Sequence, residues 1–224
     1  MGATVGVESM VAEAARYVGY CEYPPGSNRT RFGAWFGDDG VAWCDIFISY
    51  AAAHSGNAEA VGRFEGCPAH VAFFESQGRY HAPDRYAPVR GDLAFYAWGD
   101  GVPAHVGLVI SYDHDKYTFK AIEGNTSAAS EDNGGTVAVR TRYIDAPRDG
   151  FHVCGFAHPD YMEEEMTEKD FERIRAIIRE EVANWVWGFE DRHGSSAINE
   201  LANIKSRVDS NGGKLDRLLG DDGR

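Results

Sequence analysis

Four residues of this chain have side chains that together could carry out thiol-based hydrolysis: Cys44, His105, Glu123 and Asn125. A nucleophilic cysteine needs a base that takes its proton and later returns it to the leaving group. It also needs a third group that orients the base. Each of the four residues also has an ordinary structural interpretation, so the elements that surround them must decide between the two.

The cysteine stands where a thiol would be activated. Cys44 follows a short polar turn at residues 37–40 and precedes an apolar run, residues 45–54, that predicts a buried helix. A thiol in the first turn of a helix faces unpaired backbone N–H groups and the positive end of the helix dipole. Both stabilise a thiolate, which is the nucleophilic form. The alternative is an ordinary packed thiol, because free cysteines are often buried.

The best candidate for the base is His105, at the start of the apolar run at residues 104–112. An unpaired polar side chain would be costly there. Gly107, two residues further on, leaves space on the same face of the predicted strand. The alternative is a core histidine whose hydrogen bonds are satisfied.

A predicted hairpin could bring a carboxylate to this histidine. Residues 104–112 and 117–123 read as strands that are joined by a polar bend at residues 113–116. A bend centred on His114 would place His105 directly opposite Glu123, with Cβ atoms ~5 Å apart. A bend half a step away would put the two on opposite faces. Asn125 could orient the histidine instead, or donate to a developing oxyanion. An exposed turn at residues 123–126 is the alternative.

The remaining patterns predict an α+β domain over residues 1–160, with helices first and antiparallel strands later. The predicted helices are residues 8–19, ending at Gly19, residues 45–54, and residues 70–77 started by Pro68; residues 20–40 read as an irregular aromatic loop. The predicted strands are residues 90–98, 104–112, 117–123, 136–143 and 151–158.

The composition changes at about residue 160, which predicts a separate C-terminal segment over residues 161–224. An acidic linker at residues 161–167 leads into an amphipathic helix at residues 168–187. Residues 201–218 carry apolar side chains at heptad spacing, interrupted by two glycines. A coiled coil and two helices that fold back on each other are both compatible with this pattern.

The bulk composition excludes several classes of function. The net charge of −13 argues against binding to nucleic acid or anionic lipid, which needs an excess of Lys and Arg. No run approaches about 18 apolar residues, so we expect no membrane-spanning segment. The four cysteines are too few and too scattered for a disulfide framework, and they contain no C-x-x-C pair that would support a structural zinc site. The start of the chain lacks the pattern of a secretory signal, so we expect the protein to be kept in the cytosol unless something else releases it.

Taken together, these motifs resemble the CHAP domain, a family of cysteine, histidine-dependent amidohydrolases and peptidases that is common in bacteriophage endolysins. The resemblance covers roughly residues 8–160. Three motifs carry it: Trp43-Cys44 before a buried helix, Ala104-His105-Val106-Gly107-Leu108-Val109 on a strand, and Glu123-Gly124-Asn125 at the end of the next strand. The run at residues 22–37 before the cysteine and Arg90-Gly91-Asp92-Leu93 at the start of the first predicted strand also fit the family.

The resemblance implies a papain-like α+β fold and a division of roles. Cys44 would be the nucleophile, His105 the base and then the acid, Glu123 the group that orients His105, and Asn125 an assisting group. The implied reaction is amide hydrolysis through a thioester on bacterial peptidoglycan, either as an N-acetylmuramoyl-L-alanine amidase or as a peptide endopeptidase. It implies no cofactor. Some relatives bind calcium through an Asp-x-Asp cluster, but this chain has only the adjacent pair Asp38-Asp39, so we assign no metal.

The leading hypothesis is therefore a phage lysin that reaches the cell wall after release by a holin. A bacterial effector with the same chemistry is an alternative. So is a structural component of a phage particle with a lytic or inactive domain. Residues 162–224 lie outside the resemblance, and we expect them to hold copies of the chain together or to dock a wall-targeting element. A zinc amidase is disfavoured, because no H-E-x-x-H motif or paired-ligand spacing occurs.

Overall fold

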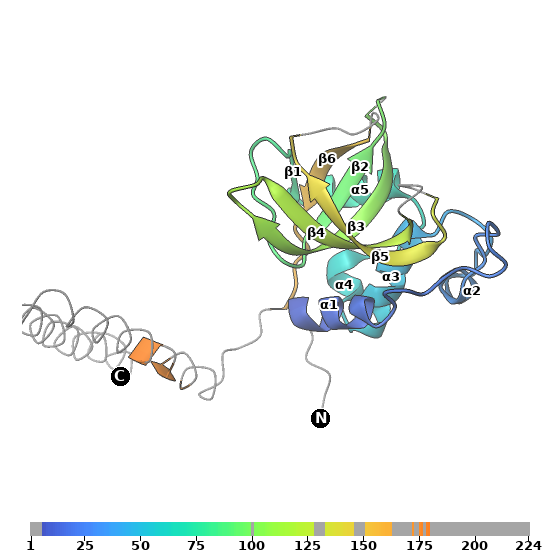
Figure 1. The fold of residues 1–224 in the computed structure, drawn as a ribbon, viewed down its shortest axis with the longest axis horizontal. Helices are drawn as coiled ribbons and strands as arrows, with labels where there is room; N and C mark the ends of the chain where they lie inside the picture. Colours follow the sequence, from blue (N-terminus) through green and yellow to red (C-terminus); the bar gives the residue numbers. More distant parts are fainter. Residues whose placement is uncertain are drawn as a thin grey trace, which may run out of the picture. The chain divides into compact units, whose positions relative to one another are not determined.

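The computed structural model describes residues 6–99, 101–127, 133–145 and 151–162, together with five isolated residues between 172 and 179. The contacts within the chain divide it into two units, residues 1–164 and 165–224. All labelled helices and strands in Figure 1 belong to the first unit.

A six-stranded antiparallel sheet forms the centre of this unit, in the order β1-β6-β2-β3-β4-β5. Neighbours from β2 to β5 are consecutive in the chain, whereas β6 returns to pair with the other side of β2. The strands are β1 (Tyr80–His81), β2 (Leu93–Ala97), β3 (Pro103–Asp113), β4 (Thr118–Thr126), β5 (Thr136–Tyr143) and β6 (His152–Ala157). The predicted strands and the α+β class are confirmed, and β5 has the predicted bounds.

Five helices precede most of the sheet in the chain. They are α1 (Val7–Ala15), α2 (Arg31–Phe36), α3 (Cys44–His54), α4 (Ala58–Val61) and α5 (Cys67–Ser76). Helix α3 packs on β3 and β4, α5 packs on β3 and β1, and α1 and α2 pack on α3. Figure 1 shows α1, α3 and α4 gathered together beside the sheet.

Four of these helices differ from the prediction. Helix α5 begins at Cys67, three residues before the predicted start at residue 70, and has Pro68 in its first turn. Helix α1 ends at Ala15 rather than Gly19, and Gly19 instead donates its N–H to Val137 of β5. Helix α2 forms inside the segment that was predicted to be a loop, because the Thr30 side chain caps its start and Gly37 ends it in the left-handed conformation. The short helix α4 was not predicted.

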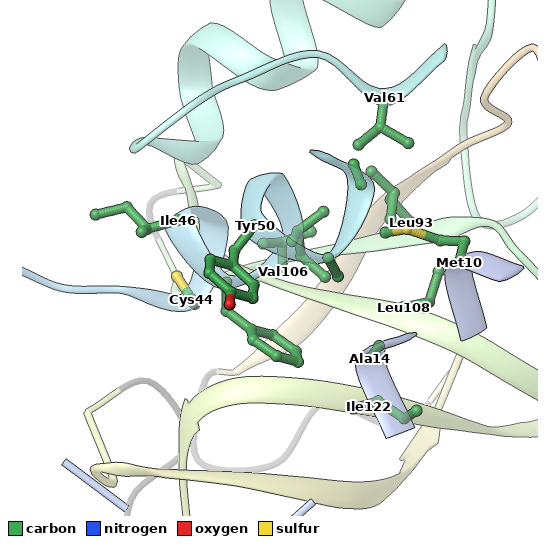
Figure 2. Close-up of a cluster of buried hydrophobic side chains, with 14 of the residues drawn as sticks. Met10, Ala14, Cys44, Ile46, Tyr50, Val61, Leu93, Val106, Leu108 and Ile122 are labelled. Carbon is green, nitrogen blue, oxygen red and sulfur yellow. The ribbon is translucent and has the colours of Figure 1, made fainter. Parts of the chain in front are cut away.

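The core lies between the helices and one face of the sheet. Alternation along β3 sends Val106 and Leu108 into this core, while Val109 belongs to a second apolar cluster on the other face. Figure 2 shows Cys44 at the start of α3, at one end of this core near Ile46 and Tyr50, with Met10, Ala14, Leu108 and Ile122 at the other end. Burying each large side chain of this kind stabilises the fold by roughly 1.5–3 kcal/mol.

Helix α3 approaches β4 closely enough to require a glycine. A Cβ atom at Gly124 would lie 2.8 Å from the Cβ of Phe47. Every α3 residue from Cys44 to Ala52 is buried, as the uniformly apolar run predicts. The start of α3 is therefore held rigidly against the middle strands of the sheet.

The predicted C-terminal elements, the helix at residues 168–187 and the heptad segment at residues 201–218, lie almost entirely outside the described residues. The described residues of that region are Glu172, Arg175, Ala176, Ile178 and Arg179, which are helical. Among the described residues, no helix is long and apolar enough to cross a membrane.

Candidate active site

Cys44 is the first residue of α3, and its side chain is buried, with a relative exposure of 4%. The pKa of its thiol lies well below the usual value. The largest cause is the neighbouring thiol of Cys67, which acts as a hydrogen-bond donor; the His105 ring and the Asp45 N–H add to this effect, and burial opposes it. This shift favours the thiolate, the nucleophilic form.

Cys67 occupies the equivalent place in α5, at the first residue of that helix. The two helix starts are tied together by a buried pair, in which His70 Nδ1 of α5 lies 2.7 Å from Asp45 Oδ1 of α3. The pKa of Cys67 is raised well above its usual value, first by the interaction with Cys44 and then by burial. The interaction therefore favours a protonated Cys67 beside a deprotonated Cys44.

His105 lies near the start of β3 and is completely buried. Its Nε2 is 3.0 Å from Glu123 Oε2. Because an ionised carboxylate can only accept, Nε2 is the nitrogen that donates. The other nitrogen, Nδ1, has no hydrogen-bond partner of ordinary geometry among the described residues. Nδ1 is therefore the nitrogen left for the thiol.

Burial opposes a charge on the His105 ring more strongly than any other single influence. Interactions with the sulfur of Cys44 and the carboxylate of Glu123 together outweigh it, and the pKa of His105 rises to about 9. A thiolate and an imidazolium therefore stabilise each other at neutral pH. This charge state is the one that a thiol nucleophile and a proton donor require.

The hairpin forms, but its predicted register is wrong. Glu123 lies opposite Gly107 rather than His105, because the bend lies later in the chain than His114, with Asp113 opposite Thr118. An irregularity between Val109 and Ser111 then shifts the pairing by one residue, which brings Glu123 opposite Gly107 instead of Leu108. His105 and Glu123 are consequently diagonal neighbours on one face, and their side chains are long enough to meet. Gly107 makes room for this, since a Cβ there would lie 2.6 Å from Glu123 Cγ.

Two side chains that the sequence analysis did not select also hold the carboxylate. Tyr96 of β2 donates its hydroxyl to Glu123 Oε1 at 3.0 Å. Arg142 of β5 donates Nε to Oε1 at 2.7 Å and Nη2 to Oε2. Burial by itself would raise the pKa of Glu123, but the hydrogen bonds from Arg142 and His105 outweigh it, so that the pKa lies below the usual value. No local motif marks Tyr96 or Arg142, because the sheet register alone brings them to Glu123.

Asn125 is buried at the end of β4, with a left-handed backbone (φ 54°) that asparagine tolerates better than most residues. Its Oδ1 accepts the N–H of Gly135 at 3.3 Å, and its carbonyl accepts the N–H of Gly134 at 2.9 Å. The orienting bond to His105 comes from Glu123. Donation by Asn125 to an oxyanion stays a prediction.

The aromatic segment before Cys44 packs beside it, as predicted. Trp43 stacks on Phe32 of α2, with ring centroids 5.6 Å apart, and its Nε1 donates to Glu22 Oε2 at 3.3 Å. Asp39 Oδ1 accepts the N–H of Thr30. In the part of the chain that is described, no cluster of three or more His, Cys, Asp or Glu side chains could hold a metal ion.

In comparisons with known proteins, no family model matches this chain, and no curated protein is significantly similar to it. The chemistry of the site must therefore be inferred from its geometry. That geometry combines a thiol of lowered pKa, a buried imidazole with one nitrogen available, and a carboxylate that fixes the other nitrogen.

Proposed function

We propose that this chain is a cysteine hydrolase with a papain-like CHAP fold that cleaves an amide bond of bacterial peptidoglycan. The observation that carries the proposal is the buried set of Cys44, His105 and Glu123, in which the histidine is hydrogen-bonded to the carboxylate at 3.0 Å and interacts with the thiol.

The reaction follows from the charge states of this set. The Cys44 thiolate attacks the carbonyl carbon, and the protonated His105 gives its Nδ1 proton to the amine nitrogen as the C–N bond breaks. The product is a thioester on Cys44 and a neutral His105. His105 then takes a proton from water, whose oxygen attacks the thioester and releases the carboxylic acid and the thiolate.

Glu123 has the same task in both steps. It accepts a hydrogen bond from the Nε2–H of His105, so that Nδ1 is the nitrogen that exchanges a proton with the reacting atoms. Since the pKa of Glu123 is lowered, it stays a carboxylate while His105 cycles between its charged and neutral forms.

The direction of substrate approach follows from burial. His105 and Glu123 have no exposed surface, whereas Cys44 retains 4%. The scissile carbonyl must therefore arrive at the exposed part of Cys44, at the start of α3. An oxyanion that forms there lies near the N–H groups of the first helical turn, which are donors without partners in the helix.

Peptidoglycan as substrate rests on the resemblance of the Cys44, His105 and Glu123-Gly124-Asn125 motifs to the CHAP domain. The stem peptides and cross-bridges of the wall supply amide bonds that such a site would cleave. Phage-type release through a holin would bring the enzyme to them.

The deciding experiment measures the loss of turbidity of purified cell walls. Cys44→Ala should abolish it, to below about one thousandth of the wild-type rate, because no other group replaces the nucleophile. Cys21→Ala, an exposed cysteine, serves as the matched control and should keep the wild-type rate. Clearing by the Cys44→Ala protein would remove the cysteine mechanism. Mass spectrometry of the released muropeptides then names the bond that is cut.

A further inference from the structure

Arg142 is a buried arginine whose guanidinium binds Glu123 in the candidate active site. It belongs to β5, the last strand of the sheet, and only 7% of its surface is exposed. Nε and Nη2 bind the two oxygens of Glu123 as a fork. Fork-like pairing of this kind fixes both the position and the plane of a carboxylate.

Two aromatic rings contact the guanidinium of Arg142 and orient it toward Glu123. In the pairing of β4 with β5, Glu123 lies opposite Ala138 and Arg142 lies opposite Phe119, so the arginine has to reach along the sheet to Glu123. The guanidinium carbon lies 5.1 Å from the ring centre of Tyr96 and 5.0 Å from that of Phe151. Contacts of a cation with aromatic faces hold the guanidinium in this direction.

A buried carboxylate in an apolar site would ordinarily take up a proton. Arginine stays charged at any pH that a protein tolerates, so a paired arginine prevents this. A protonated Glu123 would no longer offer His105 a negative partner, and the imidazolium would lose stability. The charge of Arg142 is thereby linked, through Glu123, to the proton on His105.

The other ionisable groups that act on His105, directly or through a neighbour, come from α3, α5, β2 and β4. They are Cys44 and Asp45 of α3, Glu123 of β4, and, through Glu123, Tyr96 of β2; Cys67 of α5 acts on Cys44. Arg142 is the fixed positive charge in this set.

We propose that Arg142 is a positioning residue of the active site, which keeps Glu123 ionised and turned toward His105 and so maintains the thiolate–imidazolium pair. The catalytic role of Arg142 rests on the proposed hydrolase function. Its effect on the reactivity of Cys44, however, can be measured without any substrate.

The test is the pH dependence of alkylation of Cys44 by iodoacetamide, followed on the Cys44 peptide by mass spectrometry. Arg142→Gln should raise the midpoint of alkylation by about one pH unit, and alkylation well below the midpoint should be about tenfold slower. Arg142→Lys, which keeps the charge, should restore most of the wild-type behaviour. Arg140→Gln removes an arginine from the same strand and should leave the midpoint unchanged.

A double variant separates action through Glu123 from a general structural effect. With Glu123→Gln already present, Arg142→Gln should shift the midpoint no further. This double variant also removes both buried charges together, so it avoids an unpaired carboxylate that could prevent folding. If Arg142→Gln does not fold, the double variant and Arg142→Lys still decide the question.

A wild-type midpoint in folded Arg142→Gln, an equal shift in Arg142→Lys, or additive shifts in the double variant would each overturn the proposal. None of these outcomes depends on peptidoglycan. Cell-wall clearing by Cys44→Ala would refute the hydrolase mechanism, while the alkylation data would still decide the role of Arg142.

Discussion

Two buried carboxylate–imidazole pairs lie on neighbouring elements of this protein, and they differ in what surrounds them. Asp45 and His70 join α3 to α5 at 2.7 Å, and Glu123 and His105 join β4 to β3 at 3.0 Å. All four side chains are fully buried. The comparison shows which neighbouring groups distinguish a pair that could take part in catalysis from one that only stabilises the fold.

The carboxylates differ in their charge partners. Glu123 is held by Arg142 and Tyr96, and its pKa is lowered despite burial. Among the described residues, Asp45 forms an ion pair only with His70 and its Oδ2 has no hydrogen-bond partner; burial raises its pKa. A fixed positive charge therefore separates a carboxylate that stays ionised from one that is driven toward its neutral form.

The imidazoles differ in the use of their nitrogens. His70 binds Asp45 through Nδ1 and the carbonyl of Val61, the last residue of α4, through Nε2 at 2.8 Å. His105 uses only Nε2 in this way and leaves Nδ1 for the thiol of Cys44. One histidine thus ties three helices together, and the other can move a proton.

The largest expected difference between the pairs is in catalysis. His105→Ala should reduce hydrolysis of cell walls by about 10²–10⁴-fold, the usual contribution of a general acid and base. His70→Ala should change the rate per folded molecule by less than tenfold, since its ring touches no reacting atom. Initial rates normalised to the folded fraction measure both. Equal losses would erase the distinction drawn between the two pairs.

The pair of Asp45 and His70 should contribute strongly to the stability of the fold. His70→Ala leaves Asp45 buried without its partner and should lower the free energy of unfolding by about 3–5 kcal/mol in urea titrations. His114→Ala, in the exposed bend between β3 and β4, is the control and should change it by less than about 0.5 kcal/mol. An unchanged midpoint for His70→Ala would show that this pair does not hold the helices together.

The pH profile tests the charge state of His105. His105 is a proton donor only while it is protonated, and its pKa is raised from 6.5 to about 9. Hydrolysis should therefore persist through neutral pH and fall above about pH 9, roughly tenfold per unit in the limit. A profile of kcat/KM between pH 5 and 10 measures this. A decline that begins near pH 6.5 would mean that the histidine has an ordinary pKa.

Cys67 allows a narrower test of the thiol. Cys67→Ala removes the largest influence that lowers the pKa of Cys44, so the alkylation midpoint of Cys44 should rise. Cys67→Ser keeps a donor of similar size and should restore most of the shift. Activity should fall but persist in Cys67→Ala. If the serine and alanine variants behave alike, the loss is one of packing rather than of hydrogen bonding.

The smallest effect is expected from Tyr96→Phe. This change removes one hydrogen bond to Glu123 Oε1, while Arg142 and His105 continue to bind the carboxylate. The pH midpoint of Cys44 alkylation should move by less than about one unit, in the same direction as in Arg142→Gln. A larger shift than in the arginine variant would make Tyr96 the main support of Glu123.

Much of the fold could be predicted from local pattern. The apolar run after Cys44 predicts α3, and alternating runs separated by polar bends predict β3, β4 and β5. These elements depend on periodicity, which neighbours in the chain determine. Helix α2 was missed because aromatic and glycine-rich composition masked its cap at Thr30 and its stop at Gly37.

The sequence by itself determined which residue types were available, a thiol at a helix start and an imidazole and a carboxylate on adjoining strands. Only the tertiary structure decided how they meet. The shifted register makes His105 and Glu123 diagonal neighbours, and strands far apart in the chain supply Tyr96 and Arg142. The physical reason is that a protonation state depends on burial and on charges a few ångströms away, which the packing of the sheet and helices sets.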